Sequence, residues 1–95
     1  MKIAVCDDDQ YELGIIRELL DNYEASSNIS FTVKYYNSSV ELASTAGFEK
    51  FDIYFLDIIM PVMNGLALAK EIRTFDKAAP IILSLIHISE PTRRS

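Results

Sequence analysis

The sequence predicts an α/β fold in which a parallel β-sheet lies between layers of α-helices. Short apolar segments alternate along the chain with segments whose apolar residues recur at helical spacing. Two of the apolar segments, residues 2–6 and 51–56, are followed directly by aspartates, as expected where a buried strand meets solvent. Strands that alternate with helices form parallel sheets with right-handed crossovers, so we expect three layers, α/β/α.

The composition is that of one small domain. The 95 residues suffice for a single domain, and the apolar fraction of 49% suffices for its core. A net charge of −5 argues against nucleic-acid binding by this segment. The chain has no apolar run as long as a membrane span and no signal-peptide pattern. The single cysteine fits a reducing compartment, so we expect a cytoplasmic protein without membrane contact.

The first predicted unit is a buried strand over residues 2–6 followed by an amphipathic helix over residues 10–24. Asp9 can cap the helix, because its side-chain oxygen can accept a hydrogen bond from an amide of the first turn. Glu12 stands three residues later, where it can complete a capping box.

The second predicted unit begins with a strand at the edge of the sheet. Apolar and polar residues alternate from Ile29 to Tyr35, which is typical of a half-exposed strand. Ser38 and Glu41 then form the capping box of a short helix over residues 39–46, and Gly47 is its expected C-cap.

The third predicted unit contains the central strand. Residues 51–56 end in a short, continuous apolar run and lead to Asp57 at the strand's carboxyl end. Asn64 can cap a third helix that ends near Phe75. The apolar residues 81–83 begin a fourth buried strand.

A flavodoxin-like strand order, 2-1-3-4-5, accommodates these elements. It places the alternating second strand at an edge of the sheet, and it places the strands that end at Asp7 and Asp57 side by side at the switch point. Because the recognisable elements stop at the fourth strand, we expect this fold to be incomplete at the C-terminus.

Carboxylates gather at the expected switch point. Asp7, Asp8 and Asp9 follow the first strand, and Asp57 ends the third. Clustered carboxylates resist joint ionisation unless a cation joins them, and oxygen ligands favour a hard cation such as Mg²⁺. The sequence therefore predicts an acidic pocket that binds Mg²⁺.

Two motifs carry a resemblance to a known family. Val5-Cys6-Asp7-Asp8-Asp9, together with the stretch from Asp57 to Gly65, resembles the receiver domain of two-component response regulators, the CheY-like domain. The resemblance covers residues 1–83. It implies that Asp57 accepts a phosphoryl group from a sensor histidine kinase and that the domain is a switch rather than a turnover enzyme. It also implies the ligands of Mg²⁺: Asp7, Asp8, Asp57 and the backbone carbonyl of Ile59.

The same resemblance suggests the kind of parent protein. The amino-acid sequence of residues 3–9 is most similar to that of receivers attached to LytTR-type DNA-binding domains. The resemblance therefore implies a parent protein that regulates transcription, although no such DNA-binding domain is present in the sequence.

The resemblance fails after residue 83. The family's switch hydroxyl falls at or beside Leu85, so that Ser84 is a weak candidate one residue early, and no lysine follows Lys77 to act as the switch lysine. Residues 84–95 resemble a vector- or adapter-derived peptide, with a divergent natural C-terminus as the alternative. We therefore expect a partial receiver over residues 1–83 and an atypical tail over residues 84–95.

A sheet that stopped at its fourth strand would expose an apolar edge. Such edges pair with other chains, so we expect marginal stability or self-association of the 95-residue chain.

Two other functions remain open from the sequence. Asp7 and Asp9 fit the Asp-x-Asp of haloacid-dehalogenase-like phosphatases, in which Asp7 would be the nucleophile and Asp9 the acid/base. That interpretation leaves the motif from Asp57 to Gly65 unexplained. The absent switch positions also allow a docking module that acts without phosphorylation.

Overall fold

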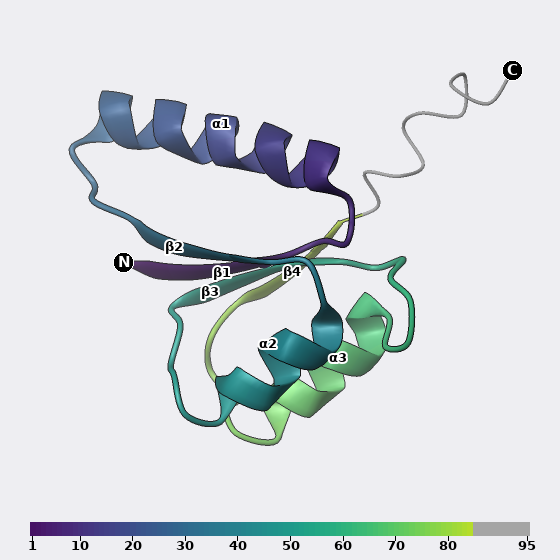
Figure 1. Cartoon of the computed structure of the whole chain (residues 1–95). Helices are drawn as coiled ribbons and strands as arrows, with labels where there is room; N and C mark the ends of the chain where they lie inside the picture. Colours follow the sequence, from purple (N-terminus) through teal and green to yellow (C-terminus); the bar gives the residue numbers. More distant parts are fainter. Residues whose placement is uncertain (85–95) are drawn as a thin grey trace, which may run out of the picture.

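Strands and helices alternate throughout residues 1–84, the part of the chain that the computed structural model describes (Figure 1). The sheet has four parallel strands in the order β2-β1-β3-β4, which confirms the flavodoxin-like order for these four strands. The elements are β1 (Lys2–Cys6), α1 (Gln10–Ser27), β2 (Thr32–Tyr36), α2 (Ser39–Ala46), β3 (Ile53–Asp57), α3 (Gly65–Arg73) and β4 (Ile81–Ser84).

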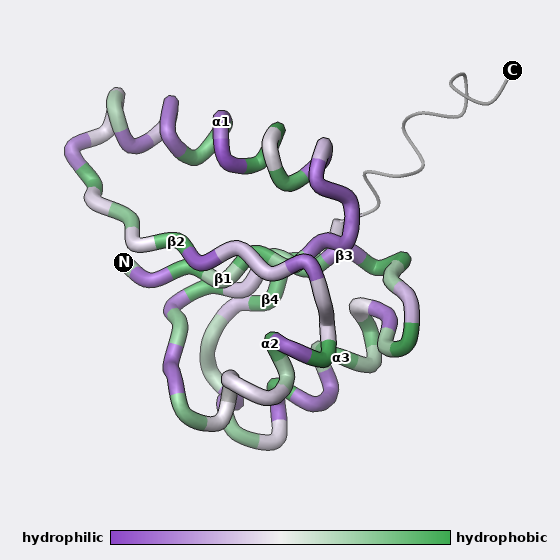
Figure 2. Tube along the Cα trace, viewed as in Figure 1, coloured by the Kyte–Doolittle hydropathy of each residue, from purple (hydrophilic) through white to green (hydrophobic). Residues whose placement is uncertain are grey.

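The helices cover both faces of the sheet. Helix α1 lies on one face, and α2 and α3 lie together on the other, so the three expected layers are present (Figure 1). Hydrophobic and hydrophilic residues alternate along α1, as they do on a helix with one face turned to a sheet (Figure 2). The α2/α3 face holds the larger buried cluster, which includes Leu42, Tyr54, Leu56, Leu68 and Ile72. The α1 face is built on Ile3, Val5 and Leu13.

The register of the sheet brings the acidic strand ends together. Cys6 of β1 pairs with Leu56 of β3, so the residues that follow, Asp7 and Asp57, leave neighbouring strands at the same edge. On the other side of β3, Asp57 pairs with Ser84 at the end of β4.

Each helix begins at the predicted cap. Asp9, Ser38 and Asn64 each occupy the N-cap position, and their side chains accept hydrogen bonds from the amides of Tyr11, Glu41 and Ala67. The short side chain of a cap satisfies an amide that has no partner within the helix. Gly47 is the C-cap of α2, also as predicted.

The capping box predicted for Glu12 is wrong. The backbone amide of Asp9 donates to Oδ1 of Asp7 at 2.9 Å, so the amide that Glu12 was expected to satisfy has another acceptor. The side chain of Glu12 instead turns into the protein and is fully buried.

The second strand begins later than predicted. Residues 29–31 precede β2, which starts at Thr32. The amide of Phe31 donates to Oε2 of Glu24 at 2.6 Å, and the Phe31 ring stacks on Tyr23 at 5.9 Å. These contacts engage Phe31 with the C-terminal part of α1. This helix extends to Ser27 rather than ending at residue 24.

None of the helices within residues 1–84 has the length and apolarity to cross a membrane. Of the predicted tail, only Ser84 belongs to the described residues, so residues 85–95, including Leu85, lie outside the structural account.

Candidate functional site

Asp57 stands at the carboxyl end of β3 with its side chain buried. Only 2% of the residue is exposed, and Oδ1 accepts a hydrogen bond from the backbone amide of Ile59 at 3.4 Å. The central strand is anchored by ladder bonds to β1 and β4 on its two sides, so the position of Asp57 is fixed by the sheet itself.

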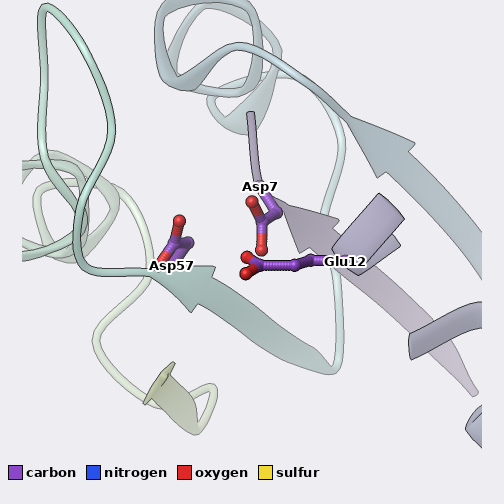
Figure 3. A group of neighbouring side chains, drawn as sticks. All are labelled: Asp7, Glu12 and Asp57. Atoms are coloured by element: carbon purple, nitrogen blue, oxygen red, sulfur yellow. The ribbon is translucent and has the colours of Figure 1, made fainter. Parts of the chain in front are cut away.

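Asp7 reaches the same place from β1. It is 1% exposed, its amide donates to the carbonyl of Tyr36 at 3.0 Å, and its Oδ1 accepts from the amide of Asp9. The backbone therefore holds one oxygen of Asp7 and one oxygen of Asp57 in place. Both predicted residues do meet at the switch point, since their carboxylates belong to one buried group (Figure 3).

Glu12 is the third member of this group, although its position in the sequence predicted a capping role instead. Oxygens of Asp7, Glu12 and Asp57 lie within 4.8 Å of one another, and the Glu12 side chain extends from α1 toward the two aspartates (Figure 3). A sequence signal was available. Glu12 precedes Ile16 and Leu20 at intervals of four residues, so it belongs to the face of α1 that packs on the sheet.

Asp8 lies outside this buried group of three. It is exposed and lines a small cavity of 100 Å³ that it shares with Ser38 and Met60 among others. Ile59, whose carbonyl was predicted as a ligand, follows Asp57 by two residues in the loop beyond β3. Both residues are therefore exposed, and their roles as ligands stay predictions.

Ser84 ends the strand beside Asp57. Its carbonyl accepts a hydrogen bond from the amide of Ile58 at 3.0 Å, which continues the β3–β4 ladder past Asp57. Asp57 and Ser84 also line one groove of 520 Å³ on the α1 side of the sheet, whose walls include Phe55 and Ile82. The predicted hydroxyl thus lies on a neighbouring strand end, and its role in switching stays a prediction.

The loop after Asp57 is folded tightly against the strand end. The amide of Gly65 donates to the carbonyl of Ile58 at 2.9 Å, and a Cβ on Gly65 would lie 2.9 Å from the carbonyl carbon of Asp57. Within this loop, Val62 has a φ of 68°, a left-handed conformation that a β-branched residue rarely adopts. The loop that shapes the site therefore contains backbone strain.

Two buried sulfur atoms, from Cys6 and Met60, contact each other next to the strand end that carries Asp7. The buried thiol of Cys6 donates to Sδ of Met60 at 3.7 Å. Burial, together with the negative charges of Asp7 and Asp57, raises the pKa of the Cys6 thiol to about 12. Burial of the thiol is the larger cause of this shift, and the carboxylates at the ends of the two strands add to it.

The donor set fits a divalent hard cation. Three buried carboxylates in mutual reach repel one another, and a proton or a cation between them relieves that repulsion. All three offer oxygen, the ligand that Mg²⁺ and Ca²⁺ prefer. The residues present are therefore suited to hold Mg²⁺ at the carboxyl edge of β1 and β3.

Asp9 is not directed into this group of three. Its Oδ1 accepts from the amide of Tyr11 at 2.8 Å as the N-cap of α1. The acid/base role that the phosphatase interpretation gave to Asp9 thus falls on a carboxylate that also caps a helix.

Solved structures of similar fold are receiver domains and related proteins. The chemotaxis protein CheY4 of Vibrio cholerae is 22% identical with a TM-score of 0.72, over 97% of this chain and 78% of that one. The receiver domain of a Pseudomonas aeruginosa sensor histidine kinase, which has a magnesium ion coordinated in its active-site cleft, is 19% identical with a TM-score of 0.77, over 99% and 74%.

A third structure, a response regulator from Burkholderia pseudomallei with a phosphorylated aspartic acid and a calcium ion, is 22% identical with a TM-score of 0.70, over 86% of this chain and 45% of that one. At these identities the similarity is one of fold. No curated protein sequence matches the chain significantly. The sequence model of the response regulator receiver domain matches residues 3–94, and the chain therefore belongs to the receiver domain family of two-component response regulators.

Proposed function

We propose that this receiver domain accepts a phosphoryl group on Asp57 from a sensor histidine kinase in a reaction that depends on Mg²⁺. The observation that carries the proposal is the buried pair of carboxylates from neighbouring strands, Asp7 and Asp57, in a chain of the receiver family. A phosphorylated aspartic acid in the Burkholderia response regulator supports the same chemistry at this fold.

The proposed step is a transfer between two nucleophiles. A carboxylate oxygen of Asp57 attacks the phosphorus of a phosphohistidine, the P–N bond breaks, and the imidazole nitrogen leaves with the electron pair and takes up a proton. The product is an acyl phosphate on Asp57. Water later attacks the phosphorus, which releases inorganic phosphate and restores the carboxylate.

The acidic residues around Asp57 do not take part in bond making. Asp7 and Asp8, with the carbonyl of Ile59, would hold the cation beside Asp57. When bound, Mg²⁺ offsets the negative charge of the phosphoryl oxygens and of the carboxylates that surround them. The amide of Ile59, which donates to Oδ1 of Asp57, orients the carboxylate for attack.

Ser84 is the proposed partner of the phosphoryl oxygens. It ends the strand next to Asp57 and lines the same groove. We therefore propose that the end of β4 takes part in the readout of phosphorylation.

Membership of the receiver family supports a proposed partner and a proposed location. The partner is a histidine kinase of a two-component system, and the proposed location is the cytoplasm. The parent is proposed to regulate transcription, supported by the similarity of residues 3–9 to receivers of LytTR-type regulators. The net charge of −5 supports the proposal that this domain does not itself bind nucleic acid.

The test is phosphorylation by a small-molecule donor such as acetyl phosphate in the presence of Mg²⁺. Intact mass spectrometry should show one added phosphoryl group that hydroxylamine removes, as it does from acyl phosphates. Asp57→Asn should abolish the addition, and the control Asp52→Asn, an exposed aspartate at the other end of β3, should leave it intact.

The same experiment separates the alternatives. Phosphorylation that survives in Asp57→Asn and disappears in Asp7→Asn would support the phosphatase interpretation instead. A chain that takes up no phosphoryl group in any form would favour a docking module that acts without phosphorylation.

A further inference from the structure

Glu12 occupies a position in the acidic pocket that the receiver motifs do not assign. It belongs to the first turn of α1, not to a strand end, and it is 0% exposed. Its carboxylate lies in the group formed with Asp7 and Asp57 (Figure 3). A buried carboxylate must be compensated by the groups that lie next to it.

The separations within the group are close to those around a single ion, and Mg²⁺ would draw the oxygens closer together. Oxygens on opposite sides of one ion are separated by twice the ion–oxygen distance, which is about 4.2 Å for Mg²⁺ and about 4.6–5.2 Å for Ca²⁺. The oxygens of Asp7, Glu12 and Asp57 lie within 4.8 Å of one another. One ion can therefore touch all three after small side-chain adjustments.

The backbone holds one oxygen of each aspartate in the group, and Glu12 does not form the predicted capping box. An amide fixes Oδ1 of Asp7 and another fixes Oδ1 of Asp57. The longer side chain of Glu12 reaches toward them from the helix (Figure 3). Asp8, in contrast, is exposed.

We infer that Glu12 is a further ligand of the divalent cation, which it binds from the interior of the pocket together with Asp7 and Asp57. The inference rests on the proposed Mg²⁺ site. A third carboxylate raises the charge of the ligand set, and ligand charge is one of the factors that tune the affinity of such sites. The cation in this chain is therefore held more tightly than the two strand-end aspartates would hold it alone.

The test is the affinity of the full 95-residue chain for Mg²⁺, measured by isothermal titration calorimetry at constant ionic strength. Glu12→Gln removes the charge and keeps the shape, and it should weaken Mg²⁺ binding by at least about tenfold. The matched control is Glu18→Gln, an exposed position of the same helix, which should change the affinity by less than about twofold.

A second variant separates direct contact from long-range attraction. Glu12→Asp keeps the charge but withdraws the oxygens by one methylene, so a ligand at this position loses contact whereas a distant charge does not. We expect Glu12→Asp to weaken binding as well. Affinity at the wild-type level in Glu12→Asp, or an affinity of Glu12→Gln equal to that of Glu18→Gln, would overturn the inference.

The stability of the variants provides a readout independent of binding. Without Mg²⁺, Glu12→Gln should melt no lower than the wild type, because it removes one of three clustered negative charges. With Mg²⁺, its gain in melting temperature should be smaller than that of the wild type. If Glu12→Gln does not fold, Glu12→Asp carries the test.

Failure of the inference and failure of the proposed function give different results. If the wild type binds Mg²⁺, Asp57→Asn binds it poorly and Glu12→Gln binds it normally, the cation site stands without Glu12. If the wild-type chain does not bind Mg²⁺, the proposed cation site itself is overturned.

Discussion

Gly65 lies so close to the backbone of Asp57 that no side chain fits between them. A Cβ on Gly65 would lie 2.9 Å from the carbonyl carbon of Asp57 and equally close to the Cα of Ile58. The amide of Gly65 also donates to the carbonyl of Ile58 at 2.9 Å. The first residue of α3 is thus packed directly on the strand end that presents the proposed phosphoacceptor.

Gly65→Ala should therefore destabilise the domain. The added methyl group meets backbone atoms, which cannot rotate away, so we expect a loss of about 1–3 kcal/mol in the free energy of unfolding. Urea denaturation measures it. The control is Gly14→Ala in α1, where a Cβ meets nothing within 4 Å. That substitution should stabilise the helix by about 0.5–1 kcal/mol. Equal effects of the two substitutions would contradict the packing described.

Val62 should be replaceable by asparagine with a gain in stability. Its side chain is 93% exposed and its φ is 68°. Replacing it with asparagine therefore loses little packing, and asparagine adopts the left-handed backbone conformation more readily than valine does. We expect Val62→Asn to raise the free energy of unfolding by on the order of 1 kcal/mol. Val40→Asn serves as control, because Val40 is also exposed but lies in α2. A gain at Val40 as large as that at Val62 would mean that removal of exposed apolar surface, not strain, is the cause.

Asp76 should make the stability depend on acid pH. Its Oδ1 accepts hydrogen bonds from the amides of Ala79 and Ala78, which lower the pKa of the carboxyl in the folded chain. Below the unfolded pKa the unfolded chain binds more protons than the folded chain, so stability falls as the pH drops through the folded pKa. This contribution is complete above about pH 4 and is lost on further acidification.

Two substitutions test this dependence by urea unfolding between neutral pH and about pH 3. Asp76→Asn keeps an oxygen acceptor and loses the titration, so its stability should fall less steeply with acid than that of the wild type. Asp76→Ala removes the acceptor and should cost about 1 kcal/mol at neutral pH. Identical acid slopes for the wild type and Asp76→Asn would show that Asp76 does not contribute.

Strand β4 should promote self-association of the 95-residue chain. It is the outer strand of the sheet within residues 1–84, and Ile82 and Leu83 on it are 43% and 36% exposed. Sedimentation equilibrium should show an average mass that rises with concentration. Ile82→Asp should shift the chain toward the monomer, because a charge on an outer strand disfavours pairing.

Ile29→Asp is the matched control for this surface. Ile29 is also partly exposed, at 40%, and precedes β2 at the opposite edge of the sheet. It should leave the association unchanged. If the wild-type chain stays monomeric across the concentration range, or if Ile29→Asp dissociates it as well as Ile82→Asp does, then β4 is not the interface.

The meeting of Asp7 and Asp57 was predictable because it depends on strand order alone. In a parallel sheet the carboxyl ends of adjacent strands share one edge, so two apolar runs that end in aspartate suffice to place both residues. The alternation in the second strand identified the edge and thereby the order. Both patterns involve residues that are close in sequence, so they can be read from the sequence alone.

Glu12 and the start of β2 were missed because local patterns had competing explanations. Glu12 stands where a capping box places its glutamate, and only its position on the apolar face of α1 indicated burial. Residues 29–31 continue the alternation of a strand, yet the amide of Phe31 bonds to Glu24 of α1. In both cases a contact with another element of the fold prevailed over the local preference.

The buried sulfur pair of Cys6 and Met60 defines what chemistry the pocket excludes. A thiol with a pKa of about 12 stays protonated at neutral pH, and this one is covered by the protein and donates to the thioether beside it. It offers neither a competing nucleophile nor a thiolate for zinc or copper ions, which soft ligands attract. Although a cysteine adjoins the acidic cluster in sequence, the donors that residues 1–84 gather in this group are hard oxygen atoms.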